Sequence, residues 1–109
     1  MTHEDTIHEY YRCFRDRDRA TLTRILLPGF RHVSPFGSYD DRDRMLEEIW
    51  PHVGAVHAVD IEIYGGGPGY MVRYRHSGGS PARFAEFVRF DGDHIAEIEV
   101  YVGRGPPPA

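Results

Sequence analysis

The sequence predicts a single α+β domain in which three N-terminal helices cap a curved antiparallel sheet. Apolar residues recur at helical spacing in the first half of the chain, and the period changes to two after about residue 56. Gly-rich segments then divide the second half into strand-length pieces. Helices followed by a run of strands are typical of an α+β fold with the helices on one face of the sheet.

Length and composition also indicate one globular domain. The chain has 109 residues, of which 40% are hydrophobic and 28% charged. We expect the domain to span residues 1–103 and the Pro-rich residues 104–109 to form a disordered tail. Cys13 is the single cysteine, which excludes an intramolecular disulfide.

The same bulk features exclude several classes of protein. No basic segment followed by an apolar run begins the chain, and no apolar run approaches the roughly 20 residues of a membrane-spanning helix. The net charge is −4, and the Arg-Asp alternation of residues 15–19 is typical of a solvated surface rather than a nucleic-acid site. We therefore expect a cytoplasmic protein that binds neither membrane nor nucleic acid.

The helices are predicted from their start and stop signals. Thr2 and Asp5 have the spacing of a capping box before the first helix. Asp18 is a candidate cap for a short second helix, which we expect Pro28-Gly29 to stop. Asp40 or Asp41 is expected to start the third.

The strands are predicted from the Pro- and Gly-rich segments that separate them. Phe30–Ser34 is predicted as a short strand followed by a Gly-Ser loop. Pro51 should end the third helix near Trp50. Four strands of a meander are then predicted, separated by the hairpin sequences GGGPG, SGGSP and DGD, at residues 56–64, 70–77, 82–90 and 94–102.

Sorting these strands by parity separates a charged face from an apolar one. The charged set runs acidic, basic, basic and acidic in strand order, which predicts a cross-strand charge ladder with acidic edge strands on a wet surface. The opposite face should therefore be buried, and Glu86 is its only formal charge. A buried carboxylate must find a partner, stay protonated or face a wet cavity. It either pairs with a donor such as Tyr10 or an arginine, or lines a pocket that the protein uses.

The order of elements, with the motifs EYYRCF, HVSPFGSYDDRD and FVRFDGDHIAEIEVY, resembles the nuclear transport factor 2-like superfamily, including SnoaL-like polyketide cyclases and ketosteroid isomerases. The resemblance implies a cone-shaped sheet enclosing an apolar pocket, and a homodimer through the outer sheet face. Ketosteroid isomerases use an Asp base with a Tyr and a protonated Asp at the oxyanion. If this chain follows that pattern, the resemblance implies that Tyr10 corresponds to the tyrosine, Glu86 to the protonated acid and Ser34 to the base.

Ser34 departs from that pattern, because a serine hydroxyl is not basic near neutral pH. His32, two residues earlier on the same strand, is the replacement candidate, with an ordinary pKa of about 6.5. The predicted catalytic set is therefore Tyr10, His32, Ser34 and Glu86. The predicted substrate-binding residues come from the first helix, the third helix and the buried sheet face: Phe14, Trp50, Ile61, Val72, Tyr74, His76, Phe84, Ile98 and Val100.

The seven histidines show no metal-ligand spacing, so we expect no metal and no cofactor. Only the fold could gather His32, His57, His76 and Glu86 around an ion. We expect His52 to add to the pocket rim and His3, His8 and His94 to be exposed. Three functions stay open: acid–base isomerisation, cyclisation or dehydration of a small apolar carbonyl or cyclic compound; binding of an apolar ligand without turnover; and a dimerisation domain.

Overall fold

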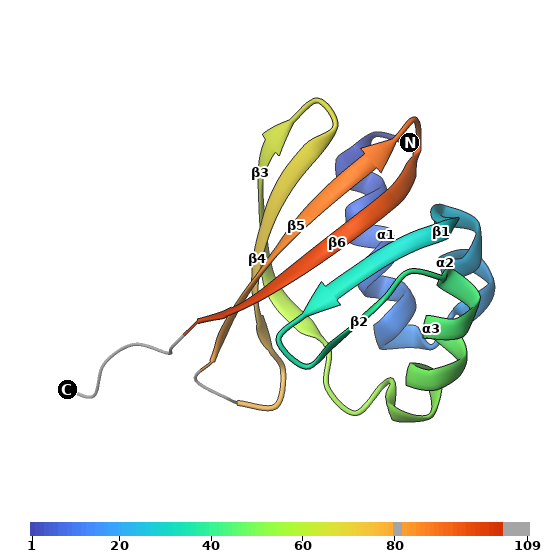
Figure 1. The fold of residues 1–109 in the computed structure, drawn as a ribbon. Helices are drawn as coiled ribbons and strands as arrows, with labels where there is room; N and C mark the ends of the chain where they lie inside the picture. Colours follow the sequence, from blue (N-terminus) through green and yellow to red (C-terminus); the bar gives the residue numbers. More distant parts are fainter. Residues whose placement is uncertain (80–81, 104–109) are drawn as a thin grey trace.

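The computed structural model describes residues 1–79 and 82–103 as three helices against one six-stranded curled sheet (Figure 1). The predicted tail at 104–109 and part of the SGGSP segment lie outside the described residues. Helix α1 lies across one face of the sheet, and α2 and α3 lie beside β1. The α+β class is confirmed. No helix in the described part of the chain is long and apolar enough to cross a membrane.

The helices begin where the caps predict. Helix α1 spans His3–Asp16, and Thr2 and Asp5 form the full capping box. Helix α2 spans Arg19–Ile25, with Asp18 accepting from the Thr21 backbone N–H. Helix α3 spans Arg42–Ile49 and is capped by Asp41. The chain then continues as a short 3₁₀ turn, Trp50–His52, with Pro51 inside it.

The first strand is longer than predicted. Strand β1 spans Leu26–Ser34, so Pro28-Gly29 does not stop α2 but lies inside the strand. The pairing of β1 with β6 shifts register between Leu26 and Arg31. Proline cannot donate to a sheet ladder and is tolerated at such irregularities. The predicted Gly-Ser loop also contains a short strand, β2 (Gly37–Tyr39), antiparallel to β1.

The meander of four strands is confirmed with boundaries shifted by one or two residues. Its members are β3 (Ala58–Gly66), β4 (Gly69–His76), β5 (Arg83–Asp91) and β6 (His94–Gly103). The sheet order is β2-β1-β6-β5-β4-β3, and β1 pairs with β6 in parallel. The prediction of a wholly antiparallel sheet with β6 at an edge was therefore wrong. Strand β1 pairs with β6 and so makes β6 an internal strand. The periodicity of single strands does not predict which distant strands pair.

The predicted charge ladder is present where the register allows it. Arg73 pairs with Glu62 at 3.0 Å, and Arg75 pairs with Asp60 across β3 and β4. Because β6 is internal, its Glu97 meets Arg31 of β1 at 3.4 Å. These contacts place the charged set on the outer face.

The core lies between the helices and the inner face of the sheet. Buried side chains of β4, β5 and β6 follow the predicted parity, with one exception in β6. There the β5–β6 register shifts after Arg89, so Ile95 faces the core opposite Phe90. The fully buried members come from every layer: Ile7, Cys13, Leu22, Leu26, Phe30, Met45, Leu46, Val72, Val88, Ile95 and Ile98.

Candidate functional site

Glu86 lies in the middle of the buried sheet face. On β5 it stands between Val72 of β4 and Val100 of β6. Its side chain is 5% exposed, and Glu86 is the only charged residue among the described buried residues. The parity argument for a buried carboxylate is therefore confirmed.

Two tyrosine hydroxyls hold this carboxylate. The Tyr74 hydroxyl donates to Glu86 Oε1 at 2.6 Å, and the Tyr11 hydroxyl donates to Oε2 at 2.9 Å. The sequence left open that Glu86 pairs with a buried donor such as Tyr10 or an arginine; the donors are buried tyrosines, but they are Tyr11 and Tyr74. Tyr10 and Tyr11 both belong to the apolar stripe of α1, but successive helix residues point about 100° apart. Of the two, it is the Tyr11 hydroxyl that donates to Glu86.

Burial changes the acid–base properties of this cluster. Desolvation raises the pKa of Glu86, while the hydrogen bonds from Tyr74 and Tyr11 oppose that rise. The pKa values of Tyr10, Tyr11 and Tyr74 are also raised, first by burial and then by the nearby Glu86 charge. The tyrosines are therefore neutral hydrogen-bond donors.

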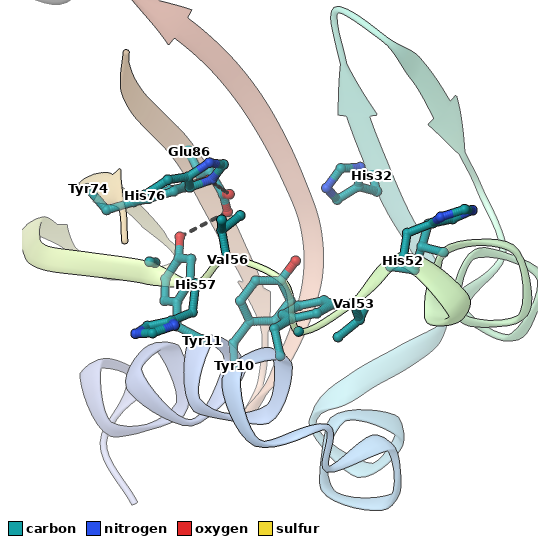
Figure 2. Close-up of a pocket in the computed structure, with 14 residues that line it drawn as sticks. Tyr10, Tyr11, His32, His52, Val53, Val56, His57, Tyr74, His76 and Glu86 are labelled. Atoms are coloured by element: carbon teal, nitrogen blue, oxygen red, sulfur yellow. Dashed lines mark hydrogen bonds between the residues drawn. The ribbon is translucent and has the colours of Figure 1, made fainter. Parts of the chain in front are cut away.

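A cavity of about 280 Å³ lies beside this cluster, between α1, the end of β1 and the segment after α3 (Figure 2). Its wall carries aromatic rings, four histidines and one carboxylate. The described residues that line it are Tyr10, Tyr11, Phe14, His32, Ile49, His52, Val53, Gly54, Val56, His57, Ala58, Tyr74, His76 and Glu86.

His32 and Tyr10 present polar atoms to this cavity. Figure 2 shows the His32 ring projecting from β1 toward the cavity, across from Glu86 and His76. Burial lowers the pKa of His32, and also that of His76. A neutral imidazole can accept a proton.

Several predicted residues reach the cavity and others do not. Tyr10, His32 and Glu86 of the predicted catalytic set line it, as do Phe14, Tyr74 and His76. Ser34 does not: its hydroxyl donates to the Gly37 carbonyl at 3.2 Å and accepts from the Phe36 N–H, holding the β1–β2 turn.

The remaining predicted pocket residues lie behind or beside the cavity wall. Val72 and Ile98 are fully buried, and Val100 packs against the core. Phe84 stacks on His76 at 4.2 Å between centroids. Trp50 packs beside Phe14 under the guanidinium groups of Arg17 and Arg19, and Ile61 lines a second depression on the other side of Tyr11.

The segment from His52 to Ala58 was largely missed from the sequence. Only His52 was expected at the rim, yet Val53, Gly54, Val56, His57 and Ala58 also line the cavity. Between the 3₁₀ turn, which ends at His52, and β3, which begins at Ala58, the chain has no regular secondary structure. Its position depends on tertiary contacts, including Arg17, whose Nη1 donates to the Val53 carbonyl and Nη2 to that of Trp50 at 3.4 Å.

The histidines of the cavity do not form a metal cluster. Within residues 1–79 and 82–103, no group of three or more His, Cys, Asp or Glu side chains is arranged to hold a metal ion. His57, one candidate ligand, lies at hydrogen-bond distance from the Ser77 hydroxyl, with 3.3 Å between Nδ1 and Oγ.

Solved structures share this arrangement of helices and sheet. An NTF2-like protein of unknown function from Cytophaga hutchinsonii superposes with a TM-score of 0.80 at 14% identity, over 94% of this chain and 91% of that one. A protein from Kribbella flavida, provisionally described as a ketosteroid isomerase, gives 0.81 at 15% identity over 98% and 83% of the two chains. This chain has the nuclear transport factor 2-like fold.

A third solved structure of the same fold is also described as an enzyme. A protein from Sinorhizobium meliloti, provisionally described as a polyketide cyclase, superposes with a TM-score of 0.78 at 19% identity, covering 89% of this chain and 94% of that one. No family model matches the chain, and no curated protein matches it in sequence. The resemblance seen in the sequence is thus confirmed for the fold.

Proposed function

We propose that this NTF2-like protein binds a small, largely apolar carbonyl or cyclic compound in the cavity and isomerises, cyclises or dehydrates it by acid–base chemistry. The observation that carries the proposal is that one cavity is lined by Tyr10, by His32 and by the Tyr11–Glu86–Tyr74 cluster. Solved proteins of the same fold with isomerase and cyclase descriptions support this class of reaction.

The proposed steps assign one task to each group. The neutral His32 imidazole takes a proton from a carbon next to the substrate carbonyl, and the electron pair moves onto the carbonyl oxygen. The Tyr10 hydroxyl donates a hydrogen bond to that oxygen as negative charge develops. The imidazolium then returns the proton to another carbon, which isomerises the substrate, or to a leaving hydroxyl, which dehydrates it.

Glu86 has a different role in this scheme from the one predicted. Both of its carboxylate oxygens already accept from tyrosines, so it acts through the hydroxyls that it holds rather than by direct contact with substrate. Ser34, which is engaged in its turn, takes no part.

Exchange of carbon-bound protons tests the proposal without knowledge of the natural substrate. Cyclic ketones in D₂O, followed by proton NMR, should exchange their α-protons faster with the protein than without it. His32→Gln should reduce this catalysed rate by roughly 10²–10⁴-fold, the usual contribution of a general base. The matched control is His94→Gln, because His94 is an exposed histidine at the start of β6. Equal rates for the two variants would refute the role of His32.

Binding without turnover is the second candidate function. It is favoured by the absence of a second carboxylate: among the described residues lining the cavity, Glu86 is the only Asp or Glu. Trp50 fluorescence can report binding, because its ring packs against the cavity residue Phe14. Quenching by ketones with no proton exchange would support a binding protein.

We also propose a homodimer through the outer sheet face. Tyr64, Met71 and Tyr101 are 54%, 40% and 49% exposed there. Met71 is paired in register with Tyr64 and Phe87, so apolar side chains cross three neighbouring strands. Exposed apolar patches of this kind mark interfaces. Sedimentation equilibrium should give twice the chain mass of 12.5 kDa, and a monomer would contradict the dimer.

A further inference from the structure

One part of the cavity wall is a weakly held segment of chain. Residues 53–57 connect the 3₁₀ turn to β3, and all of them except Ala55 line the cavity. In Figure 2 the segment crosses from the 3₁₀ turn on one side of the cavity to β3 on the other. Residues 54–56 are exposed, and within the described part of the chain no hydrogen bond joins them to another element. Segments with exposed backbone and few buried contacts are the first to open locally.

The end of this segment next to β3 is held through the backbone. The Ser77 N–H donates to the His57 carbonyl at 2.9 Å, and the His57 N–H donates to Ser77 Oγ at 3.1 Å. The next residue, Ala58, is paired in register with His76 of β4. Because two hydrogen bonds and a strand pair fix this end, the segment can pivot at His57 while β3 stays in the sheet.

The other end is held by one side chain. Arg17, which ends α1, donates from Nη1 to the Val53 carbonyl and from Nη2 to the Trp50 carbonyl at 3.4 Å. Its guanidinium carbon lies 5.5 Å from the centre of the Trp50 ring. The side chain also runs beside Gly54, because a Cβ built on that glycine would lie 3.4 Å from Arg17 Cδ. A single guanidinium thus holds the turn and the start of the segment.

The backbone at Arg17 has a conformation that glycine would favour. Its φ of 56° and ψ of 41° lie in the left-handed region, which is disfavoured for a residue with a Cβ and is common for glycine at helix ends. Glycine here would end α1 with less strain, but it could not reach the Val53 carbonyl. The role of the Arg17 side chain can therefore be tested without weakening the helix end.

We propose that residues 53–56 form a flap over the cavity, which pivots at His57 and is latched by the Arg17 guanidinium, and that this latch controls how ligands enter and leave. Arg17 is not among the described residues that line the cavity, so it is a positioning residue. The inference rests on the proposed function only in that a small molecule occupies the cavity. The pivot and the latch are properties of the free protein.

Amide hydrogen exchange, measured by NMR in the free protein, tests the latch. The Val53 N–H donates to the Trp50 carbonyl at 3.2 Å, beside the Arg17 contacts, and reports on the latched end. In Arg17→Gly this amide should exchange faster by about tenfold or more, the usual effect of losing hydrogen bonds from a charged donor. The amides of His57 and Ser77, at the pivot, should exchange as in the wild type.

Two further variants separate the latch from other effects. Arg17→Ala removes the guanidinium but keeps a Cβ at the left-handed position, so its Val53 exchange should match that of Arg17→Gly while its melting temperature should be lower. Arg19→Ala is the matched control, because Arg19 also lies over the Trp50 ring, at 5.9 Å, but donates to Glu47. Its Val53 amide should exchange at the wild-type rate.

Two results would overturn the flap. One is an unchanged Val53 exchange rate in both Arg17 variants. The other is an equal rise at Val53, His57 and Ser77, which would mean that Arg17 stabilises the whole domain rather than one end of the segment.

Cyclohexanone then tests the link between the flap and the ligand. The bound ketone should slow the Val53 exchange of the wild type, because the closed flap covers it, and should slow it much less in Arg17→Gly. Binding seen as shifts of the His32 and Tyr74 signals, with no effect on Val53, would overturn the control of ligand entry by the latch. No binding at all would contradict the proposed function, while the latch would still be decided by the exchange rates of the free protein.

Discussion

The two ends of the inner sheet face are built from the same strands but are filled differently. At one end, which we call the packed end, His3, Tyr70, Val88 and Phe90 lie in close contact. At the other, the cavity end, Tyr10, Tyr74, Glu86 and His32 surround open space. Strands β4 and β5 supply residues of the same alternation to both ends. What covers the sheet therefore decides whether a face becomes core or pocket.

At the packed end the first turn of α1 closes the gap. His3 was expected to be exposed, but its ring stacks on Phe90 with 3.9 Å between centroids. Its Nε2 lies 2.9 Å from the Gly92 carbonyl oxygen, and its Nδ1 lies 3.2 Å from the Tyr70 hydroxyl. The helix is thereby tied to the turn between β5 and β6. At the cavity end the cover is segment 52–58, between the 3₁₀ turn and β3, which leaves a hollow beneath it.

The largest expected loss of unfolding free energy comes from a substitution at the packed end. Phe90→Ala removes a ring that is 4% exposed and contacts both His3 and Tyr70. Truncation of a buried phenylalanine costs about 3–5 kcal/mol of unfolding free energy. Urea denaturation measures this loss. Phe36→Ala, at a phenylalanine that is 86% exposed, is the control and should cost far less, and an equal loss would contradict the assignment of Phe90 to the core.

A smaller effect distinguishes two tyrosines at the cavity end. Tyr74→Phe leaves Glu86 with one donor instead of two and should lower the unfolding free energy by about 1.5–3 kcal/mol, as for hydrogen bonds to charged groups. Tyr10→Phe should change it by less than about 0.5 kcal/mol, because its hydroxyl has no partner among the described residues. Equal losses in the two variants, measured in urea at pH 7, would show that Tyr10 has a structural partner.

The third prediction concerns pH and has the smallest expected effect. The folded-state pKa of Glu86 is raised by burial, so the folded protein binds more protons than the unfolded chain between the ordinary Glu pKa, near 4.5, and the raised value. Stability from this group is greatest below that window and falls as pH rises through it. Glu86→Gln cannot titrate, so the stability difference between wild type and variant should change in favour of the variant as pH rises from 4 to 7.

Urea denaturation at several pH values measures that difference. Other titrating groups are common to the two proteins and cancel in the comparison. A difference that moves in favour of the wild type as pH rises would mean that the tyrosine hydrogen bonds outweigh desolvation, and that the pKa of Glu86 is lowered.

Local signals in the sequence were sufficient for much of this fold. The caps at Thr2, Asp18 and Asp41 placed three helix starts, and period-two alternation placed Glu86 on the inner face. These features depend on residues close together in the chain, or on the fixed geometry of a strand. Contacts between distant parts of the chain rarely change a helix cap or the alternation of side chains along a strand, so these features could be predicted from the sequence.

Tertiary structure decided the remaining features. The parallel pairing of β1 with β6, the choice of Tyr11 over Tyr10 as partner of Glu86, and the engagement of Ser34 in a turn all depend on how distant elements approach one another. A helix residue one position along points about 100° away, and a few degrees of helix rotation decide which hydroxyl reaches the carboxylate. The sequence by itself determined that a carboxylate would be buried. Only the packing of α1 and segment 52–58 over the sheet determined which side chains share the cavity with it.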